Sequence, residues 1–105
     1  MAARSTRSPD RAPSHPGELL REIILPNAGL PVSRVAERLR VSRQTVHRLL
    51  AESVGVTPSM ALRLSRLFGS TPDFWLRMQQ AHDLWHESRA MAEELNGIEP
   101  IERAA

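Results

Sequence analysis

The sequence predicts an all-α fold of five helices. Apolar side chains recur at intervals of three and four residues along most of the chain, which is the spacing of one helix face. Two of these segments begin with threonine followed by proline, at Thr57 and Thr71, as expected of a capped first turn. No segment alternates apolar and polar residues as a strand does. We therefore expect one helical domain over residues 15–95.

The two ends of the chain differ from this domain in composition. Residues 1–14 contain mostly Ser, Arg, Pro and Ala, so we expect a flexible, disordered arm. The arm is either a solvated tail or a basic segment that touches a polyanion. Residues 96–105 begin with Asn-Gly and contain a proline, which predicts a short tail without a helix.

Each helix can be bounded by its cap and stop signals. The first should run from Pro16 to about Leu25, because Pro26 ends it. The second and third should cover residues 32–40 and 43–53. The fourth starts after Thr57 and stops at Gly69, for which we expect a left-handed backbone. The fifth follows Thr71 and continues to about residue 95.

The third expected helix separates two kinds of side chain. Its apolar residues, Val46, Leu49 and Leu50, fall on one side, and Ser42 stands at the N-cap position. The opposite side carries four polar residues: Arg43, Gln44, His47 and Arg48. Arginine and glutamine are the side chains that recognise guanine and adenine in the major groove. Since a short helix precedes it directly, the pair predicts a helix-turn-helix that binds double-stranded DNA.

The residues expected to contact DNA fall into two sets, one for the bases and one for the phosphates. The four polar residues above are the candidates for base contacts. A second set is placed for phosphate, with the Thr45 methyl also able to meet a thymine: Ser33, Arg34, Ser42, Thr45, Thr57 and Ser59. A single arginine here could equally be a solvated charge, or could pair with an acid as Arg48 could with Glu52. Four polar residues on one helix face favour DNA.

The fifth helix carries more apolar surface than one small core needs. Phe74, Met78, Ala81 and Trp85 form one stripe at helical spacing. This surplus predicts a homodimer, although the first helix and the tail could instead cover the surface within one chain. The expected interface residues are Trp75, Leu76, Gln79, Asp83 and Leu84.

The net charge of +2 hides an asymmetry. Residues 33–66 hold seven arginines and two glutamates, whereas residues 70–105 hold three arginines and seven acidic residues. The middle of the chain therefore suits a polyanion and the C-terminal third does not.

Several kinds of chemistry are excluded by composition. The chain has no cysteine, which removes thiol nucleophiles and cysteine zinc sites. His82 and His86 stand four residues apart without the order of a zinc protease motif, so we expect no metal, no cofactor and no enzymatic activity. No apolar run could cross a membrane and no signal peptide is evident, which predicts a cytoplasmic protein.

Four ordered segments resemble one family. Residues 15–22, H-P-G-E-L-L-R-E, are similar to the opening of HigA-type antitoxins, the lambda-repressor-like (XRE) helix-turn-helix halves of bacterial type II toxin–antitoxin modules. The segment S-R-Q-T-V-H-R-L-L at residues 42–50 differs from the family pattern at His47, which replaces a serine. Thr57-Pro58 with residues 61–64, and residues 74–76 with Gln79 and residues 83–84, match two further family blocks. The resemblance covers about residues 15–85.

The resemblance implies a five-helix lambda-repressor-like domain that dimerises through its C-terminal helices. It also implies a palindromic operator in the protein's own promoter, association with the bacterial nucleoid, and a HigB-type toxin partner, an mRNA endonuclease. Arg40 replaces the usual glycine of the turn, Ala51-Glu52 replaces Asn-Gly, and His82 replaces tyrosine. Two alternatives stay open: a free-standing XRE-family repressor without a toxin, and a toxin-binding module that has lost DNA binding and acts through its acidic C-terminal third.

Overall fold

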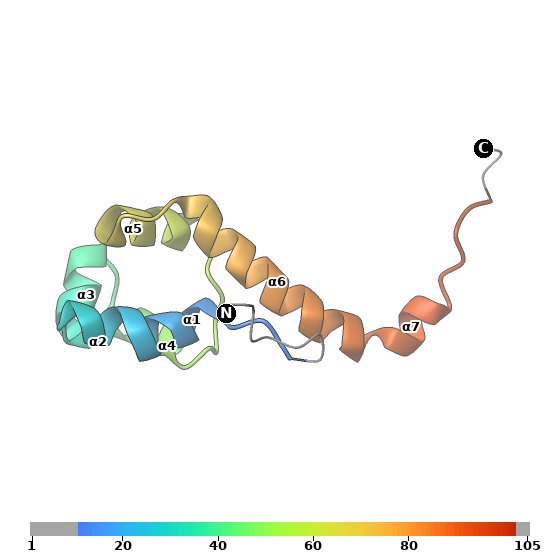
Figure 1. Cartoon of the computed structure of the whole chain (residues 1–105), viewed down its shortest axis with the longest axis horizontal. Helices are drawn as coiled ribbons and strands as arrows, with labels where there is room; N and C mark the ends of the chain where they lie inside the picture. Colours follow the sequence, from blue (N-terminus) through green and yellow to red (C-terminus); the bar gives the residue numbers. More distant parts are fainter. Residues whose placement is uncertain (1–10, 103–105) are drawn as a thin grey trace, which may run out of the picture.

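The computed structural model describes residues 11–102 and confirms the all-α prediction. α1 (Pro16–Leu19), η1 (Leu20–Ile24) and α2 (Leu25–Ala28) follow one another without a break, so they form one continuous helical segment. The remaining helices are α3 (Val32–Leu39), α4 (Arg43–Leu50), α5 (Pro58–Phe68), α6 (Pro72–Ala90) and α7 (Ala92–Asn96) (Figure 1). No strand occurs within residues 11–102.

The prediction that Pro26 ends the first helix is wrong. The chain widens into a π turn at η1, where the N–H of Leu25 donates to the carbonyl oxygen of Leu20, five residues earlier. This widening places Pro26 in the first turn of α2, where a missing N–H costs no helical hydrogen bond. The segment ends only at Gly29, which has a φ of 68°.

The caps expected at the starts of three helices are confirmed. The hydroxyl oxygens of Ser42, Thr57 and Thr71 accept the backbone N–H of Thr45, Met60 and Phe74 respectively. Gly69 ends α5 with a φ of 83°, as expected of a left-handed stop. Each capped N–H would otherwise lack a partner in the first turn, so these contacts fix where the helices begin.

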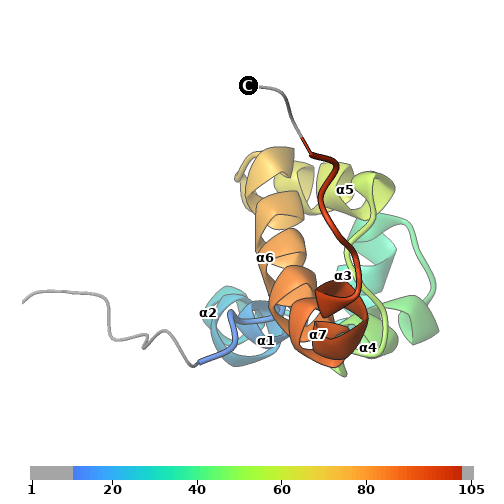
Figure 2. The same cartoon turned by 90° about the vertical axis from the view of Figure 1, so that its right-hand side faces the viewer.

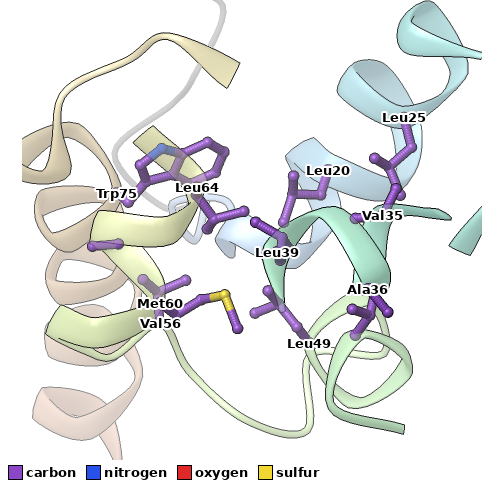
Figure 3. Packing of buried hydrophobic residues seen from close by; sticks show 12 residues of the cluster. Leu20, Leu25, Val35, Ala36, Leu39, Leu49, Val56, Met60, Leu64 and Trp75 are labelled. Carbon is purple, nitrogen blue, oxygen red and sulfur yellow. The ribbon is translucent and has the colours of Figure 1, made fainter. Parts of the chain in front are cut away.

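The core lies between the first helical segment, α3, α4, α5 and the start of α6. Figure 3 shows the buried cluster, in which Leu39, Leu64 and Trp75 come from three different helices. Trp75 is 1% exposed and Leu64 is 1% exposed, so both are shielded from solvent on all sides. Burying side chains of this size contributes about 1.5–3 kcal/mol each, which makes this cluster the main support of the helix arrangement.

The molecule is elongated, with extents of 56 × 36 × 25 Å. α3 and α5 lie at one end, and α6 leads away from the core towards α7 at the other (Figures 1 and 2). α7 is an addition to the five helices expected, because a kink at Met91, with φ −103° and ψ 15°, ends α6 early. No helix of the described residues is long and apolar enough to span a bilayer.

The structure describes only part of the predicted N-terminal arm and C-terminal tail. The predicted arm covers residues 1–14, of which residues 1–10 lie outside the described residues. Residues 12–14 are half-buried, so packing begins before His15. The predicted tail begins at the last residue of α7, and residues 97–102 are exposed.

Candidate nucleic-acid interface

α4 exposes its polar face and buries its apolar face. Val46 and Leu49 are each 2% exposed and belong to the core, and Leu50 is half-buried beside them. The side chains of Arg43, Gln44, His47 and Arg48 are all exposed. The structure thus places these residues as the helical spacing predicted. We call these four residues the reading face.

The turn before α4 is held by Arg63 of α5, a role that the sequence did not predict. Arg40 replaces the usual glycine and takes the left-handed conformation, with φ 63° and ψ 44°. A non-glycine residue in this conformation costs about 1–2 kcal/mol. The Arg63 guanidinium of α5 donates to the carbonyl oxygens of Leu39 and Arg40, at 2.6 and 3.2 Å. These charged hydrogen bonds secure the turn and hence the start of α4.

The other end of α4 is tied to the first helical segment. Arg21 donates to the carbonyl oxygen of Leu50 at 2.6 Å and pairs with Glu52 at 3.3 Å. Glu52 has a φ of 63°, so this residue takes the left-handed role for which the family pattern has glycine. Arg48 is not the partner of Glu52. The ion pair between Arg48 and Glu52, which was the alternative to a DNA contact by Arg48, therefore does not form. The Arg48 side chain is exposed.

A close backbone approach sets the distance between α1 and α4. A Cβ atom on Gly17 would collide with the carbonyl oxygen of Leu49. Only glycine allows α1 to pass this near the end of α4. The N–H of Gly17 donates to Nδ1 of His15 at 2.8 Å, which caps α1 at the same point. α4 is therefore fixed at both ends and along its buried face.

Three of the predicted contact residues meet at one hollow. Thr45 and Arg48 of α4 and Thr57, the cap of α5, line a space of about 220 Å³. Ser59 lies in the first turn of α5, where its hydroxyl accepts from Nε of Arg63 at 3.4 Å. Ser33 and Arg34 stand apart from this hollow, on the first turn of α3, and Arg34 pairs loosely with Glu37 at 3.8 Å. Contact of any of these residues with DNA stays a prediction.

Two of the five residues assigned to a dimer interface belong to the interior of the protomer. Trp75 is buried and its indole N–H donates to Oγ of Ser70 at 2.7 Å. Gln79 is 7% exposed, and its Oε1 accepts the backbone N–H of Val56 at 2.8 Å. Their assignment to exposed dimer surface is therefore corrected. Helical spacing shows which residues of α6 share a face. It does not show whether that face packs against the protomer's own core or against a second protomer.

The other three assigned residues offer surface to a partner in different degrees. Leu84 is 69% exposed, Asp83 is exposed, and Leu76 is half-buried against the core. Asp83 also accepts a hydrogen bond from Nε2 of Gln79 at 3.0 Å. Phe74, at the start of the predicted apolar stripe, is 44% exposed. A partly apolar outer face of α6 therefore faces solvent in the protomer.

The two histidines of α6 take part in a cluster of rings. His15 meets His82 edge to face with ring centroids 4.8 Å apart, and His82 lies 4.5 Å from His86. No group of metal-binding side chains occurs among the residues described. Burial and the neighbouring His82 lower the pKa of His15, since both oppose a positive charge on its imidazole.

Comparison of this sequence with known proteins identifies its family. The family described as "Helix-turn-helix" matches residues 20–75, which contain α3 and α4. An uncharacterised HTH-type transcriptional regulator of Escherichia coli K12, YbaQ, is 39% identical over 93 residues, covering 87% of this chain and 82% of that protein. Antitoxin HigA-1 of Vibrio cholerae is 35% identical over 95 residues, covering 90% of each.

Solved structures agree with the sequence relatives. Antitoxin GraA in complex with its operator superposes with a TM-score of 0.82 at 35% identity, covering 92% of this chain and 99% of that one. Pseudomonas aeruginosa antitoxin HigA with the higBA promoter gives 0.80 at 33% identity, covering 86% and 99%. Such proteins are regulators rather than enzymes, as predicted for this chain. The chain therefore belongs to the helix-turn-helix (XRE) family and is a relative of the HigA antitoxins, which confirms the resemblance found in its sequence.

Proposed function

We propose that the chain is an antitoxin that represses its own operon as a homodimer and neutralises a HigB-type mRNA endonuclease. One observation carries the DNA-binding half of the proposal: the reading face points outward while Val46 and Leu49 lock the opposite side of α4 into the core. The similar antitoxins GraA and HigA were solved with an operator and a promoter, which supports DNA binding by a protein of this fold.

In this proposal α4 enters the major groove. Arg43 and Arg48 each present a planar guanidinium that can donate two hydrogen bonds to O6 and N7 of guanine. Gln44 can pair in the same bidentate way with N6 and N7 of adenine. His47, where the family pattern has serine, brings a larger side chain with a ring nitrogen. Because the helix is fixed at both ends, these side chains meet the groove without first ordering the backbone.

Phosphate contacts orient the reading face. Thr45 and Thr57 bring hydroxyl groups to the hollow beside Arg48, at the positive N-terminal end of α5. Ser33 and Arg34 supply a second contact from the first turn of α3. The loose pair between Arg34 and Glu37 is exposed and contributes little, so Arg34 can exchange it for a phosphate.

Dimerisation uses the outer face of α6. Leu84 and Asp83 are its exposed members, with Phe74 at its start and Leu76 at its edge. A twofold axis at this face would present two α4 helices to successive major grooves, about 34 Å apart. The operator is then an imperfect palindrome, since each protomer reads one half-site.

The toxin partner follows from the relatives and from charge. HigA-1 of Vibrio cholerae is named an antitoxin and matches this chain over nearly all of its length. The excess of acidic residues after residue 70 offers a basic RNA-cleaving protein a complementary surface. A second candidate is a free-standing repressor without a toxin, which the E. coli relative named as a transcriptional regulator favours.

Two measurements test the proposal. Fluorescence anisotropy with labelled promoter DNA should show binding that a scrambled duplex of equal length does not match at physiological salt. Copurification with the product of the neighbouring gene should yield a complex whose RNA cleavage is blocked. Promoter binding without such a partner would support the free-standing repressor. Absence of promoter binding even at low salt, with toxin capture intact, would support the module that has lost DNA binding.

A further inference from the structure

A groove lined by arginines lies beside the helix-turn-helix and outside the predicted DNA contacts. It has a volume of about 480 Å³ and runs between the end of α3 and α5. Its charged lining consists of Arg38, Arg40, Arg63 and Arg66, and no acidic residue lines it. Its apolar lining includes Leu62, which is 57% exposed. We call this site the arginine groove.

The charges of the arginine groove are uncompensated within the described chain. Arg38, Arg40 and Arg66 are exposed, and none of the four arginines forms an ion pair among residues 11–102. Arg63 is committed to the carbonyl oxygens of the turn. Arg40 has the left-handed backbone that favours glycine, so it adds a positive charge to the groove at a position where glycine would have none. Like charges gathered this way favour an anionic occupant.

The chain itself carries a segment with the opposite character. Residues 92–102, which we call the acidic segment, are exposed throughout and contain Glu93, Glu94, Glu99 and Glu102 but no basic residue. Between the acids stand Leu95, Ile98 and Ile101, which are 42%, 65% and 87% exposed. Apolar side chains left this open within one short acidic stretch are typical of a segment that docks into a partner.

The groove and the segment cannot meet within one molecule as it is folded. α3 and α5 lie at one end of a body 56 Å long, and the acidic segment leaves the other end beyond α6 (Figure 1). Figure 2, viewed along the long axis, shows α7 and residues 97–102 in front of the domain. A contact between the two surfaces therefore joins separate copies of the chain.

We propose that the arginine groove of one copy binds the acidic segment of a second copy. Glutamate side chains pair with Arg38, Arg40 and Arg66, while Ile98 and Ile101 cover the exposed Leu62. Because the two surfaces are different patches, the contact is heterologous and can join further copies in addition to a pair formed through α6. It depends on neither operator binding nor a toxin.

Sedimentation velocity of the full chain without DNA tests this proposal. Wild-type protein should form species larger than a dimer as its concentration rises, and fewer of them at high salt. The groove variant Arg38→Glu with Arg66→Glu, and the segment variant Glu94→Arg with Glu99→Arg, should each weaken this association by about tenfold or more, since like charges then face each other. Combining all four changes restores opposite charges and should recover the association.

A matched control and a positional probe complete the test. Arg11→Glu with Arg43→Glu makes the same change of charge outside the groove and should leave the association unchanged. A photo-crosslinking residue at Ile98, in a mixture of isotopically light and heavy chains, should attach to residues 62–67 of the other copy. Loss of association without rescue by the fourfold variant would overturn the proposal. So would a groove variant that keeps its association but binds promoter DNA more weakly, because the groove would then be a phosphate site.

Discussion

At the scale of single residues, the reading face depends on a few long-range contacts to backbone carbonyl groups. Arg63 reaches from α5 to Leu39 and Arg40, and Arg21 reaches from the first helical segment to Leu50. Neither residue belongs to α4, yet both determine where it lies. Their roles could not be predicted from the sequence, because a local pattern does not indicate which distant carbonyl group an arginine will meet.

Removal of the Arg63 side chain should destabilise the domain. Arg63→Ala leaves the turn carbonyl oxygens without their charged donor, and we expect the free energy of unfolding to fall by about 1.5–3 kcal/mol. Urea denaturation followed by circular dichroism measures this change. Arg77→Ala serves as the control, since Arg77 is exposed and its pair with Asp73 spans 3.9 Å. Equal losses in the two variants would contradict the role given to Arg63.

His15 should make stability depend on pH. Its pKa in the folded protein lies below the ordinary 6.5, because burial and His82 oppose its charge more than Glu52 and Asp83 favour it. The unfolded chain therefore binds a proton first as the pH falls, and stability present at neutral pH is lost below about 6.5. Protonation would also remove the Nδ1 acceptor that caps α1.

Unfolding measured by urea between about pH 7 and about pH 5 checks this expectation. His15→Asn keeps a side chain suited to an N-cap but cannot titrate, so the loss of stability towards low pH should shrink. His47→Asn removes an exposed imidazole and should leave the loss as it is in the wild type. An unchanged pH profile in His15→Asn would show that another group controls it.

At the scale of elements, the helical pattern predicted the starts of α4 and α5 well, but it did not predict features that depend on packing against distant parts of the chain. Caps at Ser42 and Thr57 are local signals, and both helices begin where these residues stand. The prediction that Pro26 ends the first helix was wrong because of the π turn, which depends on how the segment packs. This turn places Pro26 in the first turn of α2, where proline is tolerated. Trp75 and Gln79 of α6 were assigned to the wrong neighbour for the same reason.

Two substitutions separate the inner and outer faces of α6. Gln79→Ala leaves the buried N–H of Val56 without an acceptor, so stability should fall by about 1–3 kcal/mol. Leu84→Asp places a charge on the exposed outer face and should leave the stability of the protomer nearly unchanged while weakening the dimer. Thermal denaturation and sedimentation equilibrium measure the two effects. A Leu84→Asp protein that dimerises as the wild type does would remove α6 from the interface.

At the scale of the whole molecule, the proposed dimer matches an operator with two half-sites. A basic middle of the chain and an acidic C-terminal third, both evident in the sequence, suit DNA on one side and protein partners on the other. The addition of α7 and the groove beside α3 appeared only in the fold, because they depend on where distant segments come together.

The spacing of the half-sites should limit binding. Five added base pairs rotate one half-site by about half a helical turn, so the two α4 helices can no longer enter their grooves together. We expect affinity for the altered duplex to fall to that of a single half-site. Anisotropy titrations with the natural and the lengthened operator make the comparison. Unchanged affinity would mean that the protomers bind independently.

The most direct test compares how wild type, Arg48→Ala and Arg34→Ala bind a set of operators with every base pair substituted in turn. Arg48→Ala should lose about 1–3 kcal/mol on the natural operator and tolerate any base at one position of each half-site. Arg34→Ala should bind all operators more weakly by the same factor, with a salt slope reduced by about one. If Arg48→Ala instead keeps the full wild-type preference at every position, the exposed face of α4 does not read the operator.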